Sequence, residues 1–241
     1  MKVYDPDCGP FYQGEIWNRS KLIQHCIEKH SYESYLEIGF GNPDNPNNNW
    51  QKISAPRKVC VDPWDITPDF VLKMTSDEFF RNNTETFDIV FIDGDHRAEQ
   101  VYKDIVNSLE VLNPGGLILT HDNSPRNAEE ESAKISGDGW KAIAFLRQRS
   151  DLDICVVPAD TGVSMIKKRK NSNQLTTKLC DWCEERREIK TICDACDLHK
   201  FLLDEEPDFS KLGYNTLASR RIEILNLVDI HFAINRWLPG D

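Results

Sequence analysis

The stretch FDIVFIDGDHRAEQVYKDIVNSLEVLNPGGLILTHD, residues 87–122, decides the fold. It begins and ends with short apolar runs that stop at aspartate, as strands of a buried sheet do. Between them, apolar residues recur at helical spacing over residues 96–112, and the NPGG sequence at 113–116 predicts a tight turn back into a strand. A strand, a helix and a second strand in this order predict two parallel strands of one sheet.

The chain on either side continues this alternation. Three more apolar runs predict strands: SYLEIGF (34–40), KVCVD (58–62) and FVLKMT (70–75). DICVVPA and GVSMIKKR, which are split by residues 160–162, predict a terminal hairpin. Helical patterns cover three further segments, residues 15–30, 76–83 and 137–147, and Ser76 is the predicted cap of the second. We therefore expect an α/β fold with a mostly parallel seven-stranded sheet and helices on both faces.

Polar residues follow every predicted parallel strand, at the edge of the sheet where such folds bind ligands. They are Glu37, Gly39 and Gly41, then Asp62, then Ser76 and Asp77, then Asp93 to His96, and finally His121 and Asp122. We expect all of them to border one crevice. Residues 123–138 form the candidate lid over that crevice.

The turn after the first strand, LEIGFGNPDN (36–45), favours a nucleotide-like ligand that carries positive charge. Two glycines let the backbone pass close to a ligand, although an ordinary tight turn would look the same. The dinucleotide pattern GxGxxG fails because Asp44 stands at its last position. A carboxylate at Glu37 would repel a pyrophosphate and suit the positive groups of S-adenosylmethionine. Asp62, at the end of the next strand, has the position of a ribose-binding acid.

The order and spacing of these runs over about residues 35–168 resemble the class I S-adenosylmethionine-dependent methyltransferases. Within that class they are most similar to the small-molecule O-methyltransferase group called Methyltransferase domain 24. The resemblance implies a Rossmann-like fold, with the cofactor's methionine end at Glu37, Gly39 and Gly41, its ribose at Asp62 and its adenine at Ser76 and Asp77. Asp93 would border the same cofactor. Pro43 replaces the last glycine of the ExGxGxG pattern, so the loop's own contacts differ.

Asp93 and His96 are the candidate catalytic residues. A histidine near neutrality can remove the proton of a hydroxyl acceptor, and Asp93 follows a core strand where the ligand must lie. Asp93, His121 and Asp122 also offer ligands for a divalent ion such as Mg²⁺. The structural alternative is that Asp95 caps the following helix, His96 lies in its exposed first turn, and His121 and Asp122 are ordinary loop residues.

The composition favours a soluble cytoplasmic protein. The chain has 241 residues and a net charge of −11, which argues against a dedicated nucleic-acid binder. No run approaches the about 20 apolar residues of a membrane span, and the N-terminus lacks a signal-peptide pattern.

The C-terminal part of the chain has a different character. We expect a methyltransferase domain at residues 1–169 and an extension at 170–241. Two CxxC pairs in the extension predict a small structural zinc site formed by Cys180, Cys183, Cys193 and Cys196. Apolar residues between 217 and 230 predict a terminal helix that docks on the core or on another subunit.

The predicted function is S-adenosylmethionine-dependent methylation of a sugar or another small metabolite on oxygen. Two alternatives remain open at this point. In the first, the methyl group goes to a nitrogen atom of a small molecule or a protein. In the second, the chain is an inactive binding or scaffold protein that keeps the fold. The sequence names neither the acceptor nor the oligomeric state.

Overall fold

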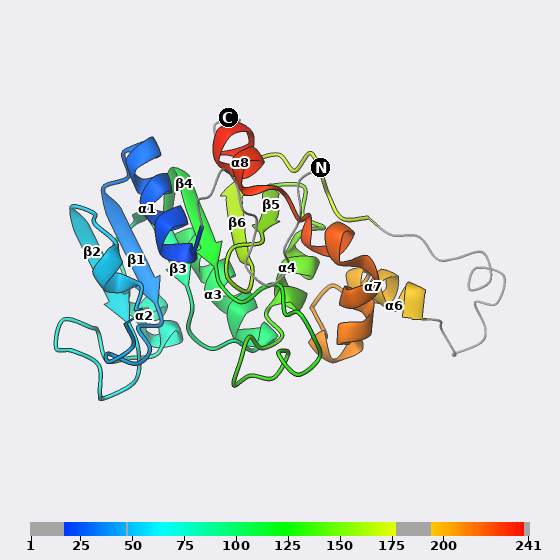
Figure 1. Cartoon of the computed structure of the whole chain (residues 1–241), viewed down its shortest axis with the longest axis horizontal. Coiled ribbons are helices and arrows are strands. Elements are labelled where there is room, and N and C mark those ends of the chain that lie inside the picture. The colour runs from blue at the N-terminus through cyan, green and yellow to red at the C-terminus, as the bar shows by residue number, and fades with distance from the viewer. Residues whose placement is uncertain (1–16, 47, 177–193, 239–241) are drawn as a thin grey trace.

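A computed structural model describes residues 17–46, 48–176 and 194–238, and its centre is a six-stranded mixed sheet (Figure 1). The strands are β1 Ser34–Ile38, β2 Arg57–Val61, β3 Phe87–Ile92, β4 Leu112–Thr120, β5 Leu152–Val157 and β6 Val163–Lys168. Their order is β2-β1-β3-β4-β6-β5. The first four are parallel, β6 is antiparallel to β4, and β5 is antiparallel to β6. This confirms the predicted parallel strands and the predicted terminal hairpin.

The predicted seventh strand, FVLKMT at 70–75, is wrong. Among these residues only Leu72 pairs with the sheet, in a single bridge to Val61 at the β2 edge. The chain turns on both sides of Leu72, because Val71 N–H donates to Pro68 and Met74 N–H donates to Leu72 itself. Phe70 and Leu72 stay exposed, so the run has no second apolar surface against which to extend.

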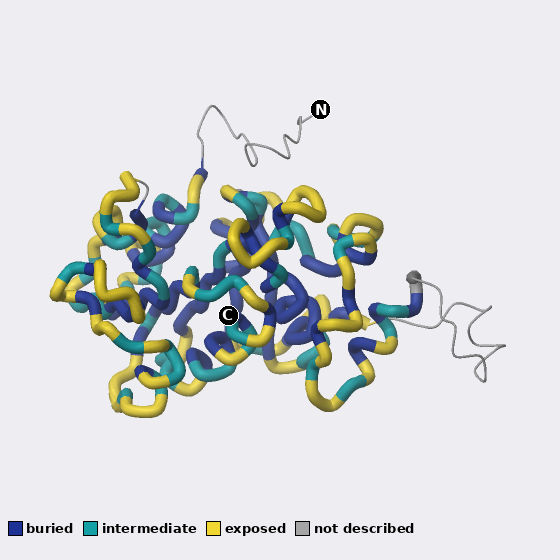
Figure 2. The backbone as a smooth tube through the Cα atoms, turned by 90° about the horizontal axis from the view of Figure 1, so that it is seen from below, coloured by how far each residue is buried: buried dark blue, intermediate teal, exposed yellow. Residues whose placement is uncertain are grey.

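Side chains of the strands alternate between two apolar cores, one on each face of the sheet. One face carries Leu36, Val90 and Ile118, and it packs against α2 Ser76–Asn82, α3 Ala98–Glu110 and α4 Trp140–Leu146. The opposite face carries Tyr35, Ile89 and Leu117, and it packs against α1 Arg19–His30. Figure 2 shows the buried segments, in dark blue, towards the middle of the molecule, with exposed segments, in yellow, around them. Helices on both faces were predicted, and this prediction is confirmed.

Several local details differ from the sequence expectations. Thr75, not Ser76, caps α2, since its hydroxyl accepts from the Glu78 N–H. NPGG lies inside β4 and does not form a separate turn. Asp95 does not cap α3: the Ala98 N–H donates to Asp138, which comes from the far end of the predicted lid. A long-range contact therefore replaces the local cap.

The C-terminal elements extend the apolar cores on both faces of the sheet. They are α6 Asp194–Leu202, η2 Phe209–Lys211, α7 Tyr214–Leu225, α8 Ile230–Phe232 and η3 Ala233–Trp237. Leu217 and Leu225 of α7 join the same core as α3 and α4, and Leu227 forms a parallel bridge with Val156 of β5. The predicted terminal helix is confirmed only in part, because it ends at Leu225 and Ile222 faces outward.

Arg147 fastens this extension to the domain. Its guanidinium is buried and donates to the carbonyl oxygens of Ile224, at 2.9 Å, and Asn173, at 2.6 Å. Among the described residues, no helix is long and apolar enough to cross a membrane.

Candidate active site

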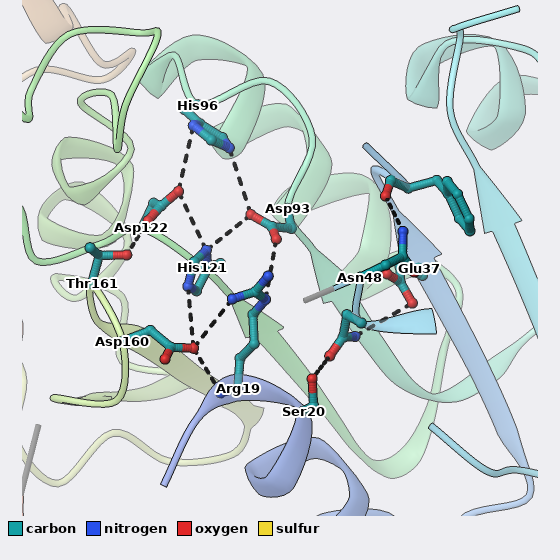
Figure 3. A network of polar contacts seen from close by, with 12 residues as sticks. Arg19, Ser20, Glu37, Asn48, Asp93, His96, His121, Asp122, Asp160 and Thr161 are labelled. Carbon is teal, nitrogen blue, oxygen red and sulfur yellow. Dashed lines mark hydrogen bonds and ion pairs between the residues drawn. The ribbon is translucent and has the colours of Figure 1, made fainter. Parts of the chain in front are cut away.

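The ends of β3 and β4 bring the predicted catalytic residues together. These strands are neighbours in the sheet, and the backbone hydrogen bonds between strands continue one residue beyond each of them. Asp93 N–H donates to the Ile38 carbonyl of β1, and His121 N–H donates to the Ile92 carbonyl of β3. The side chains of Asp93, His96, His121 and Asp122 therefore meet at one point (Figure 3). His121 Nδ1 lies 3.1 Å from one Asp93 oxygen and 3.4 Å from Asp122. This convergence was predicted from strand order.

His96 lies between the two aspartates. Its Nε2 is 3.6 Å from Asp93, and its Nδ1 is 3.5 Å from Asp122. Its Nδ1 also lies 2.8 Å from the carbonyl oxygen of Ile135 in the predicted lid. A carbonyl only accepts hydrogen bonds, so Nδ1 carries the proton and the lone pair of a neutral His96 is on Nε2. The lid thus selects the tautomer that presents a basic nitrogen beside Asp93.

The electrostatics of the cluster favour ion pairs. The hydrogen bond to Asp93 raises the pKa of His96 above its ordinary value, against the opposing effect of burial. Burial alone would raise the pKa of Asp93, but the charge and hydrogen bond of His121 hold it well below its usual range. Burial opposes the charged form of His121, yet the surrounding carboxylates, with Asp93 foremost, raise its pKa well above the ordinary value. These shifts favour an ionised Asp93 beside a protonated His121.

The turn after β4 is built to hold Asp122 in an unusual conformation. Asp122 has φ of 60°, which is the left-handed region that non-glycine residues rarely adopt. The Thr161 hydroxyl donates to its carboxylate. The next residue, Asn123, is buried, and its side-chain oxygen accepts from the hydroxyls of Thr120 and Ser164 at 2.6 and 2.7 Å. These contacts fix the direction in which Asp122 points.

Two charged residues of the cluster were missed by the sequence reasoning. Arg19, the first residue of α1, lies 3.6 Å from Asp93 through Nε. Asp160, in the β5–β6 turn, accepts from the Arg19 backbone N–H at 2.9 Å and lies 3.8 Å from His121 Nε2. They are separated by 141 residues, so no local pattern connects them. The only signal is that Asp160 lies in the turn of the predicted hairpin, at the ligand-binding edge.

The predicted cofactor turn lies directly against this cluster. Gly39 has φ of 95°, and a Cβ atom there would lie 2.2 Å from the carbonyl oxygen of Asp93. Gly41 also has positive φ, but a Cβ atom there would meet nothing within 4 Å, so the backbone faces open space. Asp62 accepts from the N–H groups of Phe40 and Gly41 at 2.8 and 3.0 Å. Asp62 thus fixes the backbone of the turn. Its contact with a ribose stays a prediction.

Glu37 is more enclosed than its predicted role requires. It is 1% exposed, and it accepts from the Tyr35 hydroxyl at 2.6 Å. Asn49 lies 3.5 Å from the same carboxylate oxygen and accepts from the Ser20 hydroxyl on α1. Burial raises the pKa of Glu37 to about 8, so it is mostly protonated at neutral pH. The fixed negative charge expected from the sequence is therefore present only above that pH, or when a cation binds.

Ser76 and Asp77 lie at the start of α2, away from the acidic cluster. Gln100 of α3 donates to both, at 3.2 and 3.1 Å, and to Asp104 at 3.0 Å. Burial raises the pKa of Asp104 to about 6. These contacts tie α2 to α3, and the predicted adenine contacts of Ser76 and Asp77 stay predictions.

In the described part of the chain, one group of three residues brings possible metal ligands close together. Ligand atoms of Asp93, His96 and Asp122 all lie within 4.8 Å of one another. The sequence predicted His121 as the third member in place of His96. Cys180, Cys183 and Cys193 lie outside the described residues, whereas Cys196 is buried in α6. The zinc site therefore stays a prediction.

The model of one protein family, described as Methyltransferase domain, matches residues 44–123. The match covers Asp62, Asp93, His96 and Asp122 and begins just after the glycine turn. It confirms the resemblance found in the sequence. The match supports a methyltransferase of the S-adenosylmethionine-dependent class, and residues 44–123 are the part of the chain that is similar to the Methyltransferase domain 24 family. No curated protein matches it.

Several solved structures of methyltransferases are similar to part of this chain. One is the methyltransferase PaMTH1 of Podospora anserina bound to SAH, with 15% identity and a TM-score of 0.49, covering 63% of this chain and 78% of that one. A second is the O-methyltransferase TomG of Streptomyces achromogenes in complex with SAM, with 14% identity and a TM-score of 0.45, covering 63% and 79%. A third is MycE of the mycinamycin pathway in complex with Mg, SAH and mycinamycin VI, with 18% identity and a TM-score of 0.40, covering 62% and 48%. At identities this low, the likeness concerns the fold alone.

Proposed function

We propose that this chain transfers a methyl group from S-adenosylmethionine to a hydroxyl oxygen of a sugar or another small metabolite. The observation that carries the proposal is the close approach of Gly39 to the Asp93 carbonyl, where a Cβ atom would lie 2.2 Å away. This contact joins the predicted cofactor turn to a cluster that contains a base. Methyl transfer needs both within one crevice, because the acceptor oxygen must attack in line with the bond that breaks.

His96 is the proposed base. As the O–CH₃ bond forms and the S–CH₃ bond breaks, the hydroxyl proton moves to Nε2 of His96, and the products are the methyl ether and S-adenosylhomocysteine. The Ile135 carbonyl keeps the proton of neutral His96 on Nδ1. Asp93, 3.6 Å from Nε2, stabilises the imidazolium that results. His121 has a positioning role, since its Nδ1 lies 3.1 Å from Asp93.

Asp93 and Asp122 are the proposed ligands of a divalent ion such as Mg²⁺. Carboxylate oxygens are the ligands that this ion prefers, and His96 completes the group within 4.8 Å. A bound ion would orient the acceptor and lower the pKa of its hydroxyl. The ion binds the carboxylates of Asp93 and Asp122, and Nε2 of His96 stays free to accept the proton of the acceptor hydroxyl.

Two other functions predict different results. Transfer to nitrogen needs neither His96 nor a metal, because an amine acceptor is already nucleophilic when neutral. A scaffold protein would bind S-adenosylmethionine without turnover. The charged cluster of two histidines and three carboxylates favours the oxygen acceptor, because burying these groups at one point has no use in a scaffold.

The cofactor assignment is tested by calorimetric titration with S-adenosylmethionine and S-adenosylhomocysteine, with and without Mg²⁺. We expect wild type to bind both compounds and Asp62→Asn to bind each at least about tenfold more weakly, since one charged hydrogen bond contributes about 1.5–3 kcal/mol. Asp65→Asn is the matched control, because Asp65 is an exposed acid three residues further along the same loop. Absence of binding to wild type would overturn the cofactor assignment.

Cys180, Cys183, Cys193 and Cys196 are proposed to hold one structural Zn²⁺ in the C-terminal extension. Elemental analysis of freshly purified full-length protein is expected to give about one equivalent of zinc, because four thiolates form a closed tetrahedral site. Cys196→Ser should lose the metal, while Cys155→Ser, a change at a buried cysteine of β5, should retain it. A wild-type content below half an equivalent would argue against this site.

A further inference from the structure

Asp93 is surrounded by cationic groups of the protein itself. One carboxylate oxygen faces His121 Nδ1 at 3.1 Å and His96 Nε2 at 3.6 Å. The other oxygen faces Arg19 Nε, also at 3.6 Å. Figure 3 shows the guanidinium entering the cluster from the side opposite His96. Each oxygen of the central carboxylate thus has a protein cation beside it.

Arg19 is held in this place from two directions. Asp160 accepts from the Arg19 backbone N–H at 2.9 Å and lies 3.4 Å from its Nη1. The next residue, Ser20, is buried and donates to Asn49 at 2.6 Å, which fixes the start of α1 against the loop after β1. The Arg19 side chain is 20% exposed, so water screens its charge only in part. The guanidinium is therefore a fixed feature of the cluster and not a chance surface contact.

A divalent ion at Asp93 and Asp122 would need the negative charge of Asp93 that Arg19 already neutralises in part. We propose that Arg19 is an internal cation that competes with the divalent ion for Asp93 and sets the metal affinity of the site. This inference rests on the metal part of the proposed function.

A purely structural role for Arg19 makes a different prediction. If Arg19 only fastens α1 to the β5–β6 turn through Asp160, its replacement lowers stability and leaves metal affinity unchanged or weaker. If it competes for Asp93, removal of the charge strengthens metal binding even where stability falls. The sign of the change in metal affinity therefore separates the two roles.

The test is a titration of the full-length protein with Mn²⁺, followed by the paramagnetic resonance signal of the free ion and made without S-adenosylmethionine. We expect Arg19→Gln to bind Mn²⁺ about tenfold more tightly than wild type, which is the middle of the range of coupling between charges in one network. Arg19→Lys, which keeps the charge, should stay within about threefold of wild type. Arg149→Gln is the matched control, because Arg149 precedes β5 at the opposite end of the sheet and pairs with Asp151.

Equal or weaker Mn²⁺ binding by folded Arg19→Gln would overturn the proposal, and so would the absence of Mn²⁺ binding in both proteins. Should Arg19→Gln fail to fold, Arg19→Met keeps the apolar part of the side chain and takes its place. Failure of both to fold would also count against competition, since it would assign Arg19 to the structural role. Calorimetric binding of S-adenosylmethionine to the same wild-type sample would show that the cofactor assignment survives any of these failures.

Discussion

Gly39→Ala is expected to have a free energy of unfolding about 2–5 kcal/mol lower than that of wild type. It is also expected to bind S-adenosylmethionine at least about a hundredfold more weakly. A Cβ atom at this position would lie 2.2 Å from the Asp93 carbonyl oxygen and 2.7 Å from Gly94 Cα, and both neighbours are backbone. No side chain can rotate to relieve this overlap, so β1 and β3 must separate at the site. Denaturant unfolding and calorimetric titration measure the two effects.

Gly41→Ala is the matched control for this prediction. Gly41 also has positive φ, at 69°, but a Cβ atom there would meet nothing within 4 Å. It should therefore show only the backbone strain, about 1 kcal/mol. Equal losses of stability in the two variants would contradict the proposed role of the contact between Gly39 and Asp93.

His96→Gln is expected to lower turnover on a hydroxyl acceptor by about 10²–10⁴-fold, the usual contribution of general base catalysis, with the affinity for S-adenosylmethionine nearly unchanged. Glutamine can still donate a hydrogen bond to Ile135, but it has no basic nitrogen to face Asp93. Single-turnover rates with a hydroxyl acceptor found by screening measure the effect. His30→Gln, at the far end of α1 from Arg19, serves as the control and should keep the wild-type rate.

The pH profile gives this prediction a second readout. The hydrogen bond to Asp93 raises the pKa of His96, so below that pKa the residue is an imidazolium and cannot accept a proton. The value of kcat/KM of wild type should therefore rise with pH through a pKa above 6.5, and His96→Gln should lack this rise. A near-full rate for His96→Gln on a hydroxyl acceptor would dismiss the base and favour transfer to nitrogen.

Much of the fold was predictable because it depends on local apolar patterns. β1, β3 and β5 are short, mostly apolar runs followed by glycine, aspartate and proline, and their side chains alternate between two cores. FVLKMT has the same composition, yet it forms one bridge, because an edge position gives it no second layer. Propensity could not separate these two cases, since the difference lies in what packs against the run.

The site was predictable to the same extent. Asp93, His96, His121 and Asp122 come together because parallel neighbours end at the same edge, and strand order alone gives that result. Which histidine groups with the two aspartates as a possible metal ligand depends on side-chain direction, which a sequence does not give. The protonated state of Glu37 follows from burial against Tyr35, and the sequence alone suggested a free carboxylate.

The sequence by itself determined the parallel part of the sheet, the edge at which its polar residues gather and the residues that meet there, because each follows from periodicity and chain order. The tertiary structure decided the charges of that cluster. Arg19 and Asp160 enter it from α1 and the β5–β6 turn across 141 residues of chain, and Asp138 caps α3 from the lid. Electrostatic energy depends on distances of a few ångströms between groups remote in sequence, and only the packed fold sets those distances.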